Sequence, residues 1–243
     1  MKVKKIIIAT FTLLLSAGCF GQNEKGTSTL SETSPKQQAY DYSTIQIIDR
    51  FHNTLRPGKW SNLFKHNEEQ FAPVYVGDIR AAIQLIYKPE RTGNRMVWDW
   101  EKDRYKDASD SSLRLTIDTS RIIGMPMSIW EYYKKTEFRR EFMAYPVFLE
   151  NISNDTLNIG FGDVFPISIE AKDKEGNWRR ILRPFERECG TDLKLIFLAP
   201  HQIAITAMPL CEGSFFTELR LVFKVRENKL IYSNIIKGYT DDL

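Results

Sequence analysis

The sequence contains 243 residues with 42% hydrophobic and 27% charged side chains, a balance typical of a folded globular protein and unlike that of a disordered chain. Its formal net charge of +3 comes from the N-terminus, because residues 1–19 hold three lysines and no acid, which leaves 31 basic against 31 acidic groups in the rest. A body without net charge has no basic field to attract a nucleic acid, so composition excludes an electrostatically driven nucleic-acid-binding protein.

The N-terminus has the pattern of an export signal. A lysine-rich start precedes an apolar run of ten residues, 6–15, which is too short to span a bilayer as a helix. The segment Leu15-Ser16-Ala17-Gly18-Cys19 follows. It resembles the lipobox of bacterial lipoproteins, although Ser16 stands where that family most often has leucine. The resemblance covers residues 1–19 only, and it implies a signal peptide over 1–18 and acylation of Cys19 as the mature N-terminus.

The residues after Cys19 bear on where the protein resides. Several acyl chains on Cys19 would hold the protein to a membrane stably. The acid-rich tract that sends some lipoproteins to the cell surface is missing from residues 20–25, so we expect an envelope protein that faces the periplasm rather than the surface. The alternative is an ordinary signal-peptidase cut, for instance after Gly21, which would give a secreted or soluble periplasmic protein. Residues 19–40, which are mostly polar and small, are predicted to be a flexible tether.

Residues 41–243 are predicted to form a single β-rich globular domain, with a sub-boundary near residue 137 as the alternative. Ser43 has the pattern of a helix cap, and the apolar residues after it recur at helical spacing as far as residue 55, so we expect a helix over 43–55. The other elements expected in this front part are a strand over 71–76, a segment over 78–87 that fits a helix or a strand, a half-buried strand over 113–117 and a short helix over 128–135.

The C-terminal half predicts β structure throughout. Short runs of β-branched and aromatic residues recur without intervening helices, which is typical of a sandwich. We expect a hairpin across the turn at 174–177 and an antiparallel meander across Pro200 and Pro209. The predicted fold is therefore mainly β with a small α+β N-terminal part and an antiparallel β-sandwich of Ig-like type in the C-terminal half. The expected strands are 145–152, 157–161, 165–171, 178–181, 193–198, 202–206, 219–225 and 230–236.

Cys189 and Cys211 are the only cysteines beyond Cys19. In an exported protein such a pair most simply forms a disulfide, and closing a loop of about 22 residues would stabilise the fold by roughly 3 kcal/mol on the chain-entropy model. Two free thiols, or a nucleophilic cysteine paired with His201, are the alternatives. The even count and the oxidising compartment favour the disulfide.

Trp98 and Trp100 are the candidate binding platform. Two residues apart on a strand, they would share one face, with Asp99 and Glu101 on the other. An exposed pair would stack on a sugar or on a partner's side chain. A buried pair would be ordinary core, which is the more frequent outcome in a domain with so many aromatic residues.

Familiar catalytic and metal-binding motifs are missing from the sequence. Its three histidines are scattered, and the four aspartates over 99–110 lack the glycine and terminal glutamate of a calcium loop, so no metal and no cofactor is expected. There is no Gly-x-Ser-x-Gly elbow, P-loop or Gly-x-Gly-x-x-Gly motif. The sequence therefore favours a non-catalytic envelope lipoprotein, a β-sandwich module that binds an unidentified protein or glycan. The alternatives are an exported hydrolase acting on glycan or peptide through unassigned carboxylates, and an immunity or inhibitor protein against an envelope toxin.

Overall fold

The computed structural model describes residues 42–49, 56–60, 71–85, 104–125, 142–161, 164–182, 195–225 and 229–241. The chain divides into two compact units, Met1–Ser34 and Pro35–Leu243, and every described residue belongs to the second. The predicted signal peptide and tether, together with Cys19, Trp98, Trp100, Cys189 and the predicted helix over 128–135, lie outside the described residues. Within those described ranges, no helix has the length and apolar character needed to cross a bilayer.

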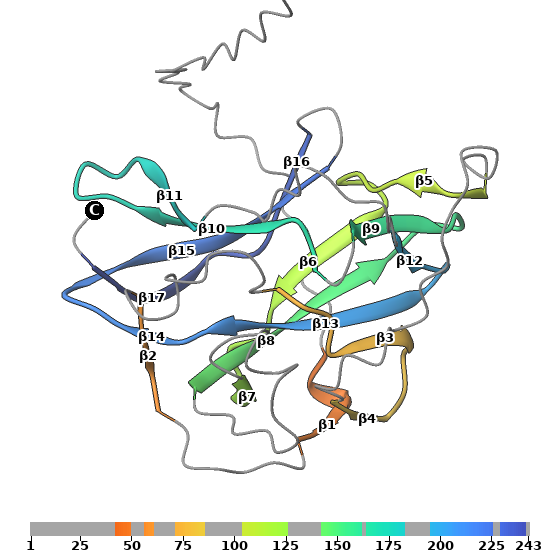
Figure 1. Cartoon of the computed structure of the whole chain (residues 1–243), viewed down its shortest axis with the longest axis horizontal. Coiled ribbons are helices and arrows are strands. Elements are labelled where there is room, and N and C mark those ends of the chain that lie inside the picture. The colour runs from red at the N-terminus through yellow and green to blue at the C-terminus, as the bar shows by residue number, and fades with distance from the viewer. Residues whose placement is uncertain are drawn as a thin grey trace, which may run out of the picture. The chain divides into compact units, whose positions relative to one another are not determined.

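Strands dominate the second unit, which confirms the prediction of a mainly β fold (Figure 1). One short 3-10 helix, η1, precedes the strands at Tyr42–Thr44. The strands are β1 (Gln46–Ile48), β2 (Gly58–Lys59), β3 (Tyr75–Asp78), β4 (Ala82–Gln84), β5 (Lys106–Asp107), β6 (Leu113–Ile117), β7 (Ile123–Met125), β8 (Phe142–Asn151), β9 (Leu157–Phe161), β10 (Ile167–Lys172), β11 (Trp178–Leu182), β12 (Leu195–Leu198), β13 (Gln202–Pro209), β14 (Cys211–Glu212), β15 (Phe215–Lys224), β16 (Leu230–Tyr232) and β17 (Ile236–Thr240).

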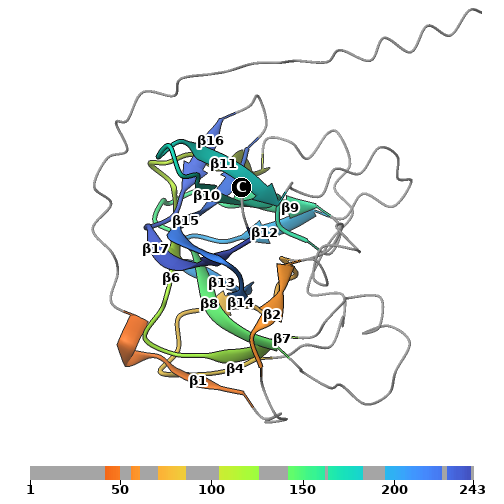
Figure 2. The same ribbon diagram turned by 90° about the vertical axis from the view of Figure 1, so that its left-hand side faces the viewer.

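The central sheet has the antiparallel order β3–β13–β8–β6, and β7 continues along the edge of β8 that β6 occupies. Residues 147–151 of β8 are all buried. Figures 1 and 2 show why: β10 and β15 lie on one side of this sheet, and β1 and β4 lie on the other. A strand covered on both faces buries consecutive residues instead of alternate ones.

The second sheet has the antiparallel order β11–β10–β15–β16, and β17 pairs with β15 beside β16. In β15, Leu219, Leu221 and Phe223 are buried in the core, whereas Glu218, Arg220 and the buried Val222 alternate with them and lie on the opposite face. Both sheets contribute to one hydrophobic cluster, which is consistent with the predicted β-sandwich. The Ig-like subtype stays a prediction. Smaller pairings complete the described fold: β12–β9–β5, β14–β2 and β1–β4.

The predicted hairpin at 174–177 is confirmed. β10 and β11 pair antiparallel across it, and the Asp173 Oδ1 accepts hydrogen bonds from the backbone N–H groups of Glu175 (3.1 Å) and Asn177 (2.7 Å). Gly176 has a φ of 84°, a conformation that glycine adopts without steric cost. Turn chemistry within a few residues is enough to specify this connection.

The predicted meander is wrong, although its strands exist. β12 pairs with β9, β13 lies between β3 and β8, and β15 lies between β10 and the strands β16 and β17. Consecutive strands are neighbours in most sheets, which made the meander the natural expectation. The apolar runs mark where strands occur, but they carry no information about which sheet each strand joins.

The predicted helix over 43–55 is also wrong where the structure describes it. η1 ends at Thr44 and β1 follows, in parallel pairing with β4; residues 50–55 lie outside the described ranges. The Arg121 guanidinium donates hydrogen bonds to the carbonyl oxygens of Tyr42 (2.6 Å) and Ile45, which holds this segment against the central sheet. Tertiary contacts of this kind override a weak helical propensity.

Candidate binding face of the second sheet

The outward side of the second sheet carries the most distinctive set of polar and aromatic side chains among the described residues. We call it the ladder face. By the alternation of strand residues this side also carries Ser168, Val222, Lys224 and Leu230, and the ladder face is the group formed by Glu170 and Lys172 of β10, Trp178 and Arg180 of β11, Phe216, Glu218 and Arg220 of β15, Tyr232 of β16, and Lys237 and Tyr239 of β17.

The strand register arranges the charges of this face in two rows. The first row is Lys172, Glu218 and Lys237, in which the Lys172 Nζ lies 2.9 Å from the Glu218 Oε2. The second row is Arg180, Glu170 and Arg220. Each carboxylate therefore stands between two cations, and each row has one cation in excess. The chain after residue 19 has no net charge, yet this face carries a local positive charge.

Arg220 is the centre of the face. Its Nε and Nη2 lie 2.9 and 2.8 Å from the Glu170 Oε2. Its guanidinium carbon lies 4.0 Å from the centroid of the Trp178 ring and 4.2 Å from that of Tyr232, so the cation is stacked between two aromatic faces. Burial raises the pKa of the Tyr232 phenol, and the charge of Arg220 opposes that rise. This closely packed group makes the middle of the face rigid.

Phe216 and Tyr239 form an exposed aromatic pair beside the rows. They face each other across β15 and β17, with ring centroids 4.9 Å apart and ring planes tilted by 53°. Their exposed fractions are 54% and 51%. The Trp60 Nε1 donates a 2.9 Å hydrogen bond to the Tyr239 carbonyl, which fixes this end of β17. Five large hydrophobic side chains are exposed among the described residues, and Phe216, Tyr239 and Ile235 are three of them.

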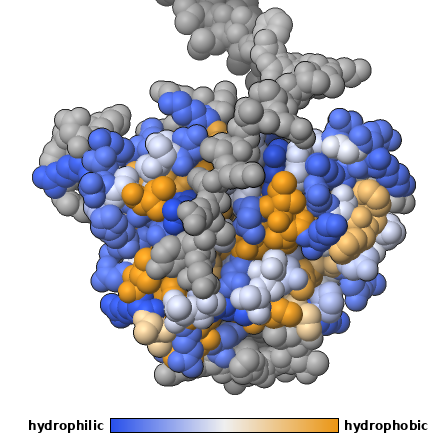
Figure 3. Space-filling model, turned by 180° about the vertical axis from the view of Figure 1, so that it is seen from behind, coloured by the Kyte–Doolittle hydropathy of each residue, from blue (hydrophilic) through white to orange (hydrophobic). Residues whose placement is uncertain are grey.

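Where described residues form the surface seen from behind Figure 1, they make no continuous apolar area. Figure 3 shows the hydrophobic residues there as separate patches among hydrophilic ones. Isolated apolar side chains are normal on a soluble protein, whereas a large continuous patch would indicate a protein interface.

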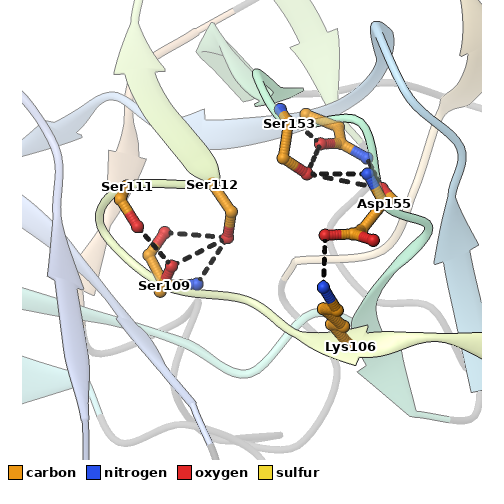
Figure 4. A network of polar contacts seen from close by, with 7 residues as sticks. Lys106, Ser109, Ser111, Ser112, Ser153 and Asp155 are labelled. Atoms are coloured by element: carbon orange, nitrogen blue, oxygen red, sulfur yellow. Dashed lines mark hydrogen bonds and ion pairs between the residues drawn. The ribbon is translucent and has the colours of Figure 1, made fainter. Parts of the chain in front are cut away.

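The loops around β8 contain a polar network made of two groups of contacts (Figure 4). The buried Asn151 Nδ2 donates to the carbonyl oxygens of Asp155 (2.7 Å) and Leu198 (2.9 Å), and its Oδ1 accepts from Ser153. The Lys106 Nζ lies 2.7 Å from the Asp155 Oδ2, and the hydroxyls of Ser109, Ser111 and Ser112 bond to one another. These bonds build the turns, so we assign the network no chemistry.

Several carboxylates of the described residues take part in ion pairs. The three that are buried each pair with an arginine at 2.8 Å: Glu150 with Arg114, Glu170 with Arg220, and Asp173 with Arg179. A general acid needs a raised pKa. At Asp173 the hydrogen bond from Arg179 lowers the carboxyl pKa. Nowhere in the described ranges do three His, Cys, Asp or Glu side chains gather closely enough to hold a metal ion.

Cys211 is the one predicted disulfide residue that the structure describes. It lies in β14 with 9% of its surface exposed and carries a free thiol, whose pKa burial raises. A buried thiol of that kind is a poor nucleophile. Because Cys189 lies outside the described residues, the Cys189–Cys211 disulfide stays a prediction without structural support.

Sequence reasoning selected Trp98 and Trp100 as a platform, and both lie outside the described residues, so that prediction is untested. It missed the pair Phe216 and Tyr239. A signal was present, since Glu218 and Arg220 alternate with Leu219 and Leu221, and Phe216 lies two residues before Glu218. Only the pairing of β15 with β17 shows that the two rings meet.

No protein-family model matches the chain, and no curated protein shows significant similarity to it. The ladder face is therefore the main evidence on function.

Proposed function

We propose that this chain is a non-catalytic envelope lipoprotein, a β-sandwich module that is anchored through Cys19 and binds a partner with its ladder face. The observation that carries the proposal is the half-exposed pair Phe216 and Tyr239, which lies on a rigid sheet beside two rows with excess cations. Aromatic rings and cations grouped on one surface are typical of recognition sites.

The charge arrangement supports binding over hydrolysis. Hydrolysis of a glycan or a peptide by carboxylates needs one carboxyl group that keeps its proton near neutral pH. In the described residues, each buried carboxylate lies 2.8 Å from an arginine, and at Asp173 the hydrogen bond from Arg179 lowers the carboxyl pKa. A hydrolase therefore finds no support in the parts of the chain that the structure covers.

The anchor and the tether complete the proposal. A flexible chain over residues 19–40 would have a root-mean-square length of roughly 25 Å. The module would therefore stay close to the membrane and meet envelope components at high local concentration. Export also suits the proposed Cys189–Cys211 disulfide, for which the test is mass spectrometry of the unreduced mature protein; two free thiols would contradict it.

The anchor is tested by fractionation of cells that produce the wild-type chain or the Cys19→Ser variant. We expect the wild-type protein in the membrane fraction and the variant in the soluble fraction, because the variant has no thiol to acylate. Equal amounts of both proteins on the membrane would contradict the anchor.

The binding face is tested with the soluble Cys19→Ser protein and isolated envelope fragments. We expect the protein to sediment with the fragments, and the added changes Phe216→Ala and Tyr239→Ala to reduce the bound fraction several-fold. Ile122→Ala is the matched control, because Ile122 is an apolar side chain with 49% exposure that lies outside the ladder face. Unchanged sedimentation of the double ring variant would refute the assignment of the face, and release of soluble fragments by the wild-type protein would favour a hydrolase.

A further inference from the structure

We infer that the ligand of the ladder face is an acidic glycan, a polysaccharide whose sugar rings carry carboxylate, phosphate or sulfate groups. The inference rests on the proposed function, because it names the class of ligand for the same face.

The exposed rings are suited to sugars. One face of a pyranose ring presents C–H groups that are apolar and slightly electropositive, and the face of an aromatic ring is electronegative, so the two stack. Phe216 and Tyr239 are each about half exposed with centroids 4.9 Å apart, so together they offer an area comparable to one or two sugar rings. The pairing of β15 and β17 holds both rings in place before a ligand arrives.

The cations beside the rings favour an acidic sugar over a neutral one. Lys237 lies on the same side of β17 as Tyr239, about 7 Å away along the strand. Arg180 lies at the other edge of the sheet, three strand spacings or about 14 Å from β17. Both side chains are exposed and end the two charge rows. An extended chain with acidic groups at intervals would place its charges at these cations while its rings contact Phe216 and Tyr239.

The size and composition of the face argue against an acidic protein as the main partner. A stable protein interface buries about 800 Å² on each partner around an apolar centre, whereas two half-exposed rings supply roughly 100 Å² each. The centre of the ladder face holds the ion pairs Lys172–Glu218 and Arg220–Glu170, which a protein partner would have to desolvate. A hydrated polysaccharide can follow the rings and the edge cations and leave these pairs in contact with water.

The inference is tested by affinity electrophoresis of the full mature chain carrying Cys19→Ser. The gels contain dextran sulfate, neutral dextran, or poly-L-glutamate, which supplies charge without sugar rings. We expect the strongest retardation by dextran sulfate. The variants Phe216→Ala with Tyr239→Ala, and Arg180→Gln with Lys237→Gln, should each weaken that binding about fivefold or more. Ile122→Ala and Lys106→Gln should leave it unchanged, because they remove an exposed apolar side chain and an exposed cation elsewhere.

Four results would overturn the inference. Equal retardation by poly-L-glutamate, or unchanged binding of the ring variant, would mean that charge attraction alone acts. Equal retardation by neutral dextran would mean that the acidic groups are irrelevant. Failure of all three polymers to bind would exclude a glycan of this class. If no polymer binds, sedimentation with envelope fragments decides whether the proposed function stands. The proposed function stands if Phe216→Ala with Tyr239→Ala no longer sediments with the fragments, and it fails if this variant sediments like the wild-type protein.

Discussion

Replacing Arg220 with alanine should destabilise the protein more than any other single change on the ladder face. The side chains of Arg220 and Glu170 are 13% and 9% exposed, and the guanidinium is stacked between Trp178 and Tyr232. Removing one member of a buried ion pair costs about 3–5 kcal/mol, because the other charge is left without its partner. Arg180 lies opposite Glu170 on β11 and can compensate in part, so we expect a loss of about 3 kcal/mol in the free energy of unfolding.

Urea denaturation of a small set of variants would separate the contributions. Arg220→Lys keeps the charge but loses the planar group that stacks on two rings, so its cost should be intermediate. Glu170→Ala combined with Arg220→Ala leaves no orphaned charge, so the double variant should cost less than the sum of the two single variants. A cost of under about 1 kcal/mol for Arg220→Ala, or additive single costs in the double variant, would show that water screens the pair and would refute this reasoning.

Three further predictions concern other contacts. A Cβ on Gly213 would clash with the Thr240 carbonyl group, so Gly213→Ala should cost about 1–3 kcal/mol in a thermal or urea unfolding assay. Gly176→Ala should cost less, because its Cβ would have nothing within 4 Å although its φ is 84°. Asn234 accepts a hydrogen bond from the Ile117 N–H (2.7 Å) and donates one to the Ile117 carbonyl (3.1 Å), so Asn234→Ala should cost about 1–3 kcal/mol and accelerate hydrogen exchange at Ile117; unchanged exchange would contradict this role. Burial, and then the charge of Glu150, raise the pKa of Tyr42 above its ordinary value of 10.0, so the stability that the neutral phenol provides is present below pH 10 and is lost as the pH rises further. Tyr42→Phe should therefore cost about 1 kcal/mol at neutral pH and make stability less sensitive to alkaline pH; parallel alkaline unfolding curves for both proteins would be the contrary result.

The alternation of side chains and the turn residues determined the local elements of this protein. The strands β6, β9 and β11 lie where apolar and β-branched runs place them, and the hairpin between β10 and β11 follows from Asp173 and Gly176 in its turn. Such features depend on sterics and hydrogen bonds within a few residues, so a single sequence contains them.

The tertiary structure alone decided the pairing of strands and the make-up of the ladder face. β12, β13 and β15 are close in sequence but belong to three different sheets, and β1 replaces a predicted helix because β4 pairs with it. The face joins Glu170 to Arg220 and Phe216 to Tyr239 across strands that the sequence could locate but could not pair. These contacts depend on which strands pair and which apolar surfaces cover one another in the whole domain. Those choices are made between residues that are far apart in the chain.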